Sequence, residues 1–159
     1  MTPAKPSRPD MPGYGIVGEK EGAGLLPWSF AEERMAKARN YWIGTVSPDG
    51  RPHAAPVWGL WHASAFYFST GSHSRKGRNL AAQPAVSVHS ESGDEAVMFE
   101  GHVEKVSDKA LLKALDKAYK GKYGLPMQVP GIIFQLNAER VFAWREKDFP
   151  ESATRWIFG

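Results

Sequence analysis

The chain contains no cysteine and no long apolar run. Without thiols it can form neither disulfides nor an iron–sulfur cluster, and it has no cysteine nucleophile and no thiolate zinc ligand. Its longest apolar segments, such as Ala96–Phe99 and Ile132–Phe134, are too short to cross a bilayer. A basic N-terminus followed by an apolar stretch, typical of export signals, is also absent. We therefore expect a cytoplasmic protein with no membrane partner.

The chain also has little excess of one sign of charge over the other. The 159 residues carry a formal net charge of +3, with 23% charged and 42% hydrophobic residues, which is typical of one globular domain. The cations do not form one long run, so a nucleic-acid partner is not expected. A basic barrel that stacks single-stranded bases on aromatic residues is the alternative, but Phe66 and Phe68 share one strand face and read as core.

Prolines and glycines are concentrated in residues 1–24, which predicts a flexible or surface-draped arm before a single domain at 25–159. A first helix is predicted at Ser29–Asn40, where Ser29 and Glu32 form a capping box. Further helices are predicted at Gly77–Gln83 and Ser107–Tyr123. Period-two segments predict strands at Tyr41–Ser47, Arg51–Trp61, Ala65–Ser69, Ala85–His89, Glu95–Val106, Ile132–Leu136 and Arg140–Arg145. This order indicates a mainly β fold, an antiparallel barrel of six or seven strands with two or three helices.

The segment Phe66–Pro84 carries the clearest chemical signal. An aromatic strand ends in Ser69 and Thr70, and a loop with hydroxyls and cations leads into a short helix. Backbone amides at a helix start, hydroxyl groups, and the cations Arg75 and Lys76 together suit a phosphate group. The alternative is a solvated basic loop in which Ser74 only caps the helix.

The segment Ala54–Gly59 precedes this loop by one hairpin, so we expect it to lie beside Phe66–Thr70 in the sheet. The chain has a first strand with a PDG turn. The motifs RPH-x-x-PVW, YFST and S-x-S-R-K-x-x-NL follow it in this order. With these motifs the chain resembles the pyridoxamine 5'-phosphate oxidase-like family of flavin and deazaflavin proteins. The resemblance covers residues 28 to 106 well and the C-terminal part more loosely. It implies a Greek-key split β-barrel and a homodimer with the cofactor cleft between the subunits.

The resemblance also implies site residues. The strand after the PDG turn would lie against the cofactor ring, and the loop before the short helix would hold the phosphoryl group. Trp144 and Arg155 are candidates to reach across to the partner's cofactor, and His53 either lines the cleft or is an ordinary surface or core histidine. The remaining cofactor-binding candidates are Arg51, Ala55, Pro56, Val57, Trp58, Ser69, Thr70, Ser74, Arg75 and Lys76.

Within this family we expect the deazaflavin coenzyme F-420 rather than flavin mononucleotide (FMN). Its anionic tail would need additional cations, for which the candidates are Arg51, Arg78, Lys5, Arg8 and Lys20. Pyridoxamine phosphate oxidation itself is disfavoured, because Ser152–Trp156 lacks the Arg-x-His element of those oxidases. The expected activity is a reductase acting on a small conjugated or aromatic acceptor, and the alternatives are a cofactor carrier and an FMN-dependent oxidase. We expect no protein acid or base, because the cofactor transfers the hydride, and no metal, because the histidines lie on separate elements.

Overall fold

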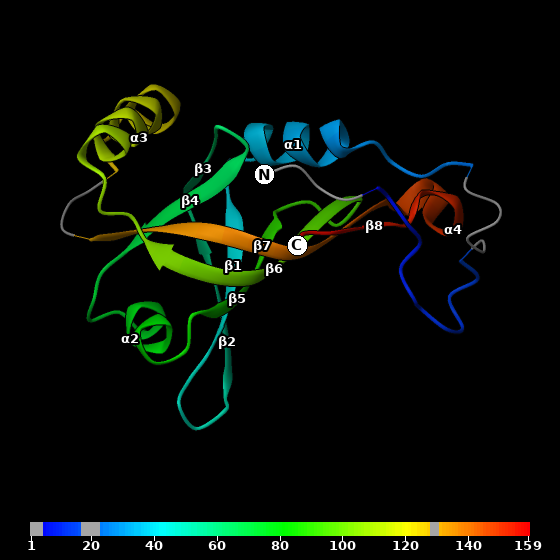
Figure 1. Cartoon of the computed structure of the whole chain (residues 1–159), viewed down its shortest axis with the longest axis horizontal. Coiled ribbons are helices and arrows are strands. Elements are labelled where there is room, and N and C mark those ends of the chain that lie inside the picture. Colours follow the sequence, from blue (N-terminus) through cyan, green and yellow to red (C-terminus); the bar gives the residue numbers. More distant parts are fainter. Residues whose placement is uncertain (1–4, 17–22, 128–130) are drawn as a thin grey trace.

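The computed structural model describes residues 5–16, 23–127 and 131–159. The chain is mainly β, and its strands form one curled antiparallel sheet in the order β2-β1-β5-β6-β7-β4-β3, with β8 beside β7 (Figure 1). The strands are β1 (Tyr41–Val46), β2 (Pro52–Val57), β3 (Gly59–His62), β4 (Ala65–Thr70), β5 (Ala85–Ser90), β6 (Glu95–Lys105), β7 (Ile132–Arg145) and β8 (Thr154–Ile157). The helices are α1 (Trp28–Lys37), α2 (Arg75–Ala82), α3 (Lys109–Tyr123) and α4 (Phe149–Ser152), and one 3₁₀ turn at Glu146–Asp148 precedes α4. The predicted mainly β barrel is confirmed, with eight strands and four α-helices in the described residues.

The curled sheet separates two apolar clusters. Its inner face and α1 enclose the main core, which includes Tyr41, Phe66 and Phe99. A second cluster lies between β3, β4 and α3, where Leu60 packs with Leu115. A helix covers each cluster, and this lowers the exposed apolar area of the sheet. No helix in the described ranges is long and apolar enough to span a membrane.

The predicted strand Arg51–Trp61 is in fact two strands that separate at Trp58. β2 pairs with β1, with Ala54 opposite Gly44, whereas β3 pairs with β4. The expectation that Ala54–Gly59 lies beside Phe66–Thr70 is therefore wrong for the β2 part. The separation follows from Trp58, whose ring stacks on Tyr123 of α3 at a centroid distance of 4.7 Å and so leaves the sheet.

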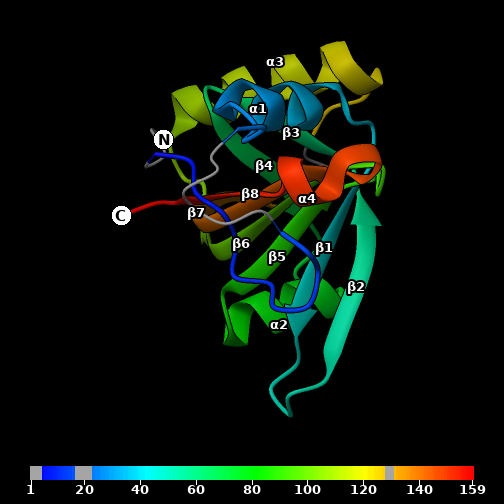
Figure 2. The same cartoon turned by 90° about the vertical axis from the view of Figure 1, so that its right-hand side faces the viewer.

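β2 is an edge strand and forms a long hairpin with β1 that projects from the body of the molecule (Figure 2). Proline has no N–H for a sheet ladder and is tolerated mainly at sheet edges, so Pro52 and Pro56 fit this position. The predicted turn before it is confirmed: the N–H of Gly50 donates to the carbonyl oxygen of Ser47 at 2.8 Å, and Gly50 has a φ of +83°. The two nearby tryptophans lie on opposite sides of the sheet: Trp61 packs on the main core and Trp58 on the second cluster.

The predicted closing pair Ile132–Leu136 and Arg140–Arg145 is one continuous strand, β7, of 14 residues. Leu136 and Ala138 both face the core, so the apolar alternation runs through the expected turn. The extra residue is Glu139 of β7, which has no partner where the register shifts opposite Glu100 and Gly101 of β6. A Cβ at Gly101 would collide with the carbonyl oxygen of Asn137, which explains the glycine at this bulge.

The predicted capping box of α1 is wrong. The helix begins at Trp28 after Pro27, whose φ of −71° and ψ of 155° are extended, and no side chain caps it. Ser29 therefore lies inside the first turn, and Glu32 instead accepts a hydrogen bond from Ser64 Oγ at 2.8 Å. Trp28 packs against Trp156 with ring centroids 5.4 Å apart, and this long-range contact fixes where the helix starts.

The described part of the N-terminal arm is attached to the C-terminal segment. The Arg8 side chain is only 4% exposed, and its guanidinium donates to the carbonyl oxygens of Glu151, Ala153 and Ala23. Ser7 forms an isolated antiparallel bridge with Arg155. The flexibility expected for residues 1–24 remains a prediction.

Lys122 joins α3 to the barrel. Its Nζ donates to Tyr41 Oη at 2.8 Å and to the carbonyl oxygen of Gly59 at 3.2 Å. Burial lowers the pKa of Lys122 to about 8, and nearby Glu91 offsets part of that effect. The charged ammonium is therefore disfavoured in the folded chain relative to the unfolded chain.

This pKa makes the stabilising contribution of Lys122 dependent on pH. Between about 8 and the ordinary value of 10.5, the unfolded chain keeps a proton that the folded chain has released, so stability rises with pH. We expect the unfolding free energy of the wild type minus that of Lys122→Met to increase from about pH 7.5 to about pH 9.5, measured by urea denaturation. Lys120→Met, on the exposed side of the same helix, is the control. A wild-type-to-variant difference that does not change with pH would contradict the assignment.

Candidate functional site

The loop between β4 and α2 is built around Ser74. Its Oγ donates to the carbonyl oxygen of Gly71 at 2.8 Å and accepts the N–H of Gly77 at 3.0 Å, so it caps α2. The Thr70 hydroxyl lies 2.8 Å from the same Oγ. A Cβ at Gly77 would collide with the carbonyl oxygen of Gly71, so only glycine allows the loop to close this tightly. Ser74 therefore shapes the loop, as the capping interpretation required, and its hydroxyl hydrogen is already used.

Asn79 determines where α2 lies against the sheet. Its side chain is 3% exposed, and Nδ2 donates to Thr45 Oγ1 of β1 at 3.0 Å. Thr45 is paired with His53 of β2, so this bond brings the start of α2 to the inner side of the β1–β2 hairpin. From the sequence alone, Asn79 has no predicted role beyond its place in the motif before Leu80. The available signal was a polar residue next to buried Leu80 in a short amphipathic helix.

Arg75 and Lys76 carry positive charges that no carboxylate neutralises among the described residues. Arg34, Arg140 and Arg145, in contrast, each pair with at least one carboxylate. Within those same described ranges, the backbone N–H groups of Arg75 and Lys76 have no hydrogen-bond partner either. Two open amides at a helix start, with two cations beside them, form an arrangement that is suited to an anion.

His53 belongs to the same arrangement. Burial lowers its pKa most, and the positive charges of Arg75 and then Lys76 lower it further, which places the ring within electrostatic reach of both cations. Ala55 and Val57 share the inner face of β2 with His53. The outer edge of β2 has no strand partner in the part of the chain that is described. The anion-binding groups thus lie next to a sheet edge whose backbone is open, a combination suited to a ligand with a phosphate end and a flat ring.

Four candidates lie elsewhere. Arg51 is exposed at the hairpin tip, where its Nε is 3.0 Å from Asp49. Pro56 faces the opposite side of β2 from His53. Trp58 uses one ring face to stack on Tyr123, and Ser69 Oγ donates to the carbonyl oxygen of Met127 at 2.9 Å.

Trp144 and Arg155 lie on the outer face of the sheet. Trp144 is paired with Ala96 and contacts Phe149 edge-on at 5.5 Å, while Arg155 is paired with Phe142 and its Nε donates to Ser7 Oγ at 3.3 Å. Within one chain the thickness of the sheet therefore separates both residues from His53. The structure does not bring them to the anion-binding arrangement.

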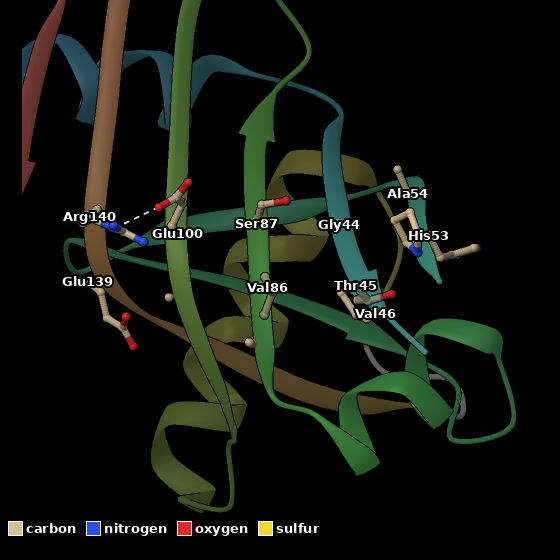
Figure 3. Close-up of a pocket in the computed structure, with 13 residues that line it drawn as sticks. Gly44, Thr45, Val46, His53, Ala54, Val86, Ser87, Glu100, Glu139 and Arg140 are labelled. Atoms are coloured by element: carbon tan, nitrogen blue, oxygen red, sulfur yellow. Dashed lines mark ion pairs between the residues drawn. The ribbon is translucent and has the colours of Figure 1, made fainter. Parts of the chain in front are cut away.

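The outer face carries an open groove of about 730 Å³ across β2, β1, β5, β6 and β7 (Figure 3). Gly44, Ser87 and Gly101 line it, and the ion pair of Glu100 with Arg140, 2.9 Å apart, lies at one end. The adjacent row of paired residues on this face is apolar or aromatic. It consists of Pro56, Trp42, His89, Met98 and Phe142. In the described ranges no group of three or more histidine or acidic side chains is placed to hold a metal ion.

The fold matches several solved structures. A conserved hypothetical protein of Mycobacterium tuberculosis superposes with a TM-score of 0.68 and 23% identity, covering 83% of this chain and 88% of the other. A structure described as an F420 reductase has a TM-score of 0.56 and 23% identity, covering 69% and 94%. A haem storage protein of Vibrio cholerae has a TM-score of 0.59 and 20% identity, covering 73% and 90%. At these identities the similarity establishes the fold.

Sequence comparison establishes the family. A pyridoxine/pyridoxamine 5'-phosphate oxidase of Bacteroides thetaiotaomicron is 34% identical over 122 residues, which is 72% of this chain. The match covers 54% of that relative, so the chain spans about half of its length. The family model for pyridoxamine 5'-phosphate oxidase matches residues 30–145, from α1 to the end of β7. The chain belongs to the pyridoxamine 5'-phosphate oxidase family.

Proposed function

We propose that the chain binds a phosphorylated tricyclic redox cofactor and acts as a reductase that passes hydride to a small conjugated or aromatic acceptor. The observation that carries this proposal is the pair of unneutralised cations, Arg75 and Lys76, at the start of α2 beside the inner face of β2. The similarity to a structure described as an F420 reductase supports it.

The residues present fit such a group. The open amides at the start of α2, together with Arg75 and Lys76, would hold the phosphoryl end, and the backbone of Ala55 and Val57 would lie along the ring. Thr70 and Ser74 would keep the loop in shape. When bound, a flavin or deazaflavin supplies the hydride chemistry itself, so the chain has only to bind, orient and shield it.

We favour the deazaflavin F-420 over FMN. Its anionic tail needs cations beyond the phosphate site, and Arg51, Arg78 and Lys5 are exposed. Arg8 is excluded from this role, because its guanidinium is buried on backbone carbonyls, and Lys20 lies outside the described residues. FMN remains the alternative, supported by the family and by the named oxidase relative. Ser152–Trp156 lacks the Arg-x-His element that the resemblance to pyridoxamine phosphate oxidases implies.

We further propose that the chain is a homodimer joined through the outer face of the sheet. Trp42 and Val46 are 39% and 40% exposed on this face, an unusual position for large apolar side chains. A two-fold interface uses the same patch on both copies. Joining two outer faces would bring Trp144 and Arg155 towards the partner and make them available to its cofactor.

Removing either cation should weaken cofactor binding. Each of Arg75→Ala and Lys76→Ala removes a charge-assisted hydrogen bond of about 1.5–3 kcal/mol, so we expect roughly tenfold or greater loss of affinity. Parallel fluorescence titrations with F-420 and FMN measure this and identify the cofactor. Lys113→Ala, which removes an exposed positive charge from α3, should bind like the wild type. Unchanged affinity in both cation variants would refute the phosphate assignment.

Turnover separates a reductase from a carrier. With reduced cofactor and an acceptor dye, the wild type should reduce the dye faster than the protein-free mixture. The double variant Arg75→Ala/Lys76→Ala should reduce it at the protein-free rate, because the cofactor is no longer held. Tight cofactor binding without any acceleration would support a carrier instead.

A single substitution on the outer face tests the proposed dimer. Trp42→Glu places a carboxylate in the outer apolar row, and sedimentation should then show a monomer where the wild type is a dimer. Lys113→Glu, on α3, serves as the charge-matched control and should stay dimeric. A wild type that sediments as a monomer at high concentration would exclude this arrangement.

A further inference from the structure

The ring of His53 lies in a position that disfavours its protonation. It is half-buried on the inner face of β2, opposite Thr45, whose hydroxyl already accepts from Asn79. Its Nδ1 is buried and has no hydrogen-bond partner among the described residues. In a neutral ring with its hydrogen on Nε2, the buried Nδ1 is only an acceptor. A protonated ring would instead place an unpaired N–H donor at Nδ1. The free chain therefore favours the neutral ring.

The charges around His53 act in the same direction. From α2 it faces Arg75 and Lys76, and both lower its pKa after the larger effect of burial. From β1 it faces Thr45, which does not titrate. No carboxylate contributes to holding a proton on the ring. The acidic groups of the hairpin tip and the outer groove have partners of their own: Asp49 with Arg51, Glu100 with Arg140, and Glu139 with His102.

We propose that His53 couples anion binding at the start of α2 to the uptake of a proton. In the free chain the ring is neutral, and when a dianionic phosphoryl group binds beside Arg75 and Lys76, one proton moves from solvent to the imidazole. This inference rests on the proposed function, since it requires the anion site. His53 thereby acts as a positioning residue whose charge appears only when the ligand is present.

The physical reason is electrostatic. The positive charges of Arg75 and Lys76 disfavour the imidazolium. A dianion bound beside them offsets both charges, so the protonated form of His53 becomes more favourable. A monoanionic carboxylate offsets only one of them, so the coupling favours a dianionic phosphate over a carboxylate. By linkage, proton uptake on binding means that affinity for the dianion rises as pH falls through the pKa of the occupied state.

Inorganic sulfate is the sharpest probe, because its own charge does not change near neutral pH and every proton taken up belongs to the protein. NMR titration of the histidine ring signals of the full chain gives the pKa of His53 directly, with sulfate and with chloride at equal ionic strength. We expect sulfate to raise that pKa by about one unit, which corresponds to about tenfold tighter binding to the protonated form. His73, exposed in the adjacent loop, is the internal control and should move less.

The variants give a second readout. Sulfate affinity, followed by the amide shifts of Arg75 and Lys76, should strengthen as pH falls in the wild type and in His73→Gln. In His53→Gln, the affinity for sulfate should depend little on pH. Sulfate that shifts both amides while His53 titrates unchanged would overturn the proton coupling and leave the anion site standing. Sulfate that fails to shift those amides would overturn both, because no anion then binds at α2.

Discussion

The hydrogen bond from Asn79 Nδ2 to Thr45 Oγ1 fixes the position of α2 on the barrel. Both side chains are almost fully buried, so each would remain without a partner if the helix moved. Leaving a buried polar group unsatisfied costs about 1–3 kcal/mol, and a shift by one helical turn would leave two. The start of α2, with the cations that follow Ser74, therefore stays beside β2. The site depends on this placement more than on any single charged residue.

Local chemistry made the loop before α2 predictable. Ser74, Gly77 and the neighbouring cations act within a few residues of one another, so the cap and the cationic helix start follow from the sequence. The PDG turn is local in the same way. Asn79 was not recognised, because its partner Thr45 lies 34 positions away and on another element.

Long-range packing explains the parts that sequence patterns could not predict. The separation of β2 from β3 depends on aromatic residues of α3, which lie about 65 positions further along the chain than Trp58. The start of α1 depends on Trp156 near the opposite end. β7 continues without a turn, because the bulge at Glu139 opposite Gly101 of β6 takes up the extra residue.

The candidate residues divide between the two faces of one sheet. Adjacent strand positions alternate in direction, which sends the Ser69 hydroxyl to Met127 and that of Thr70 to Ser74. The same rule places His53 inside, and Trp144 outside with its pair Ala96. A complete cofactor cleft that used residues from both faces of the sheet would therefore need a second copy of the chain.

The attachment of Arg8 has a consequence for how the chain is made. Two of its carbonyl acceptors, those of Glu151 and Ala153, lie at the C-terminal end of α4, where the helix dipole is negative. A ribosome releases residues 5–16 long before these acceptors exist. This earlier-made segment must therefore wait without its partners, and it can dock only after the C-terminal segment around α4 has been synthesised.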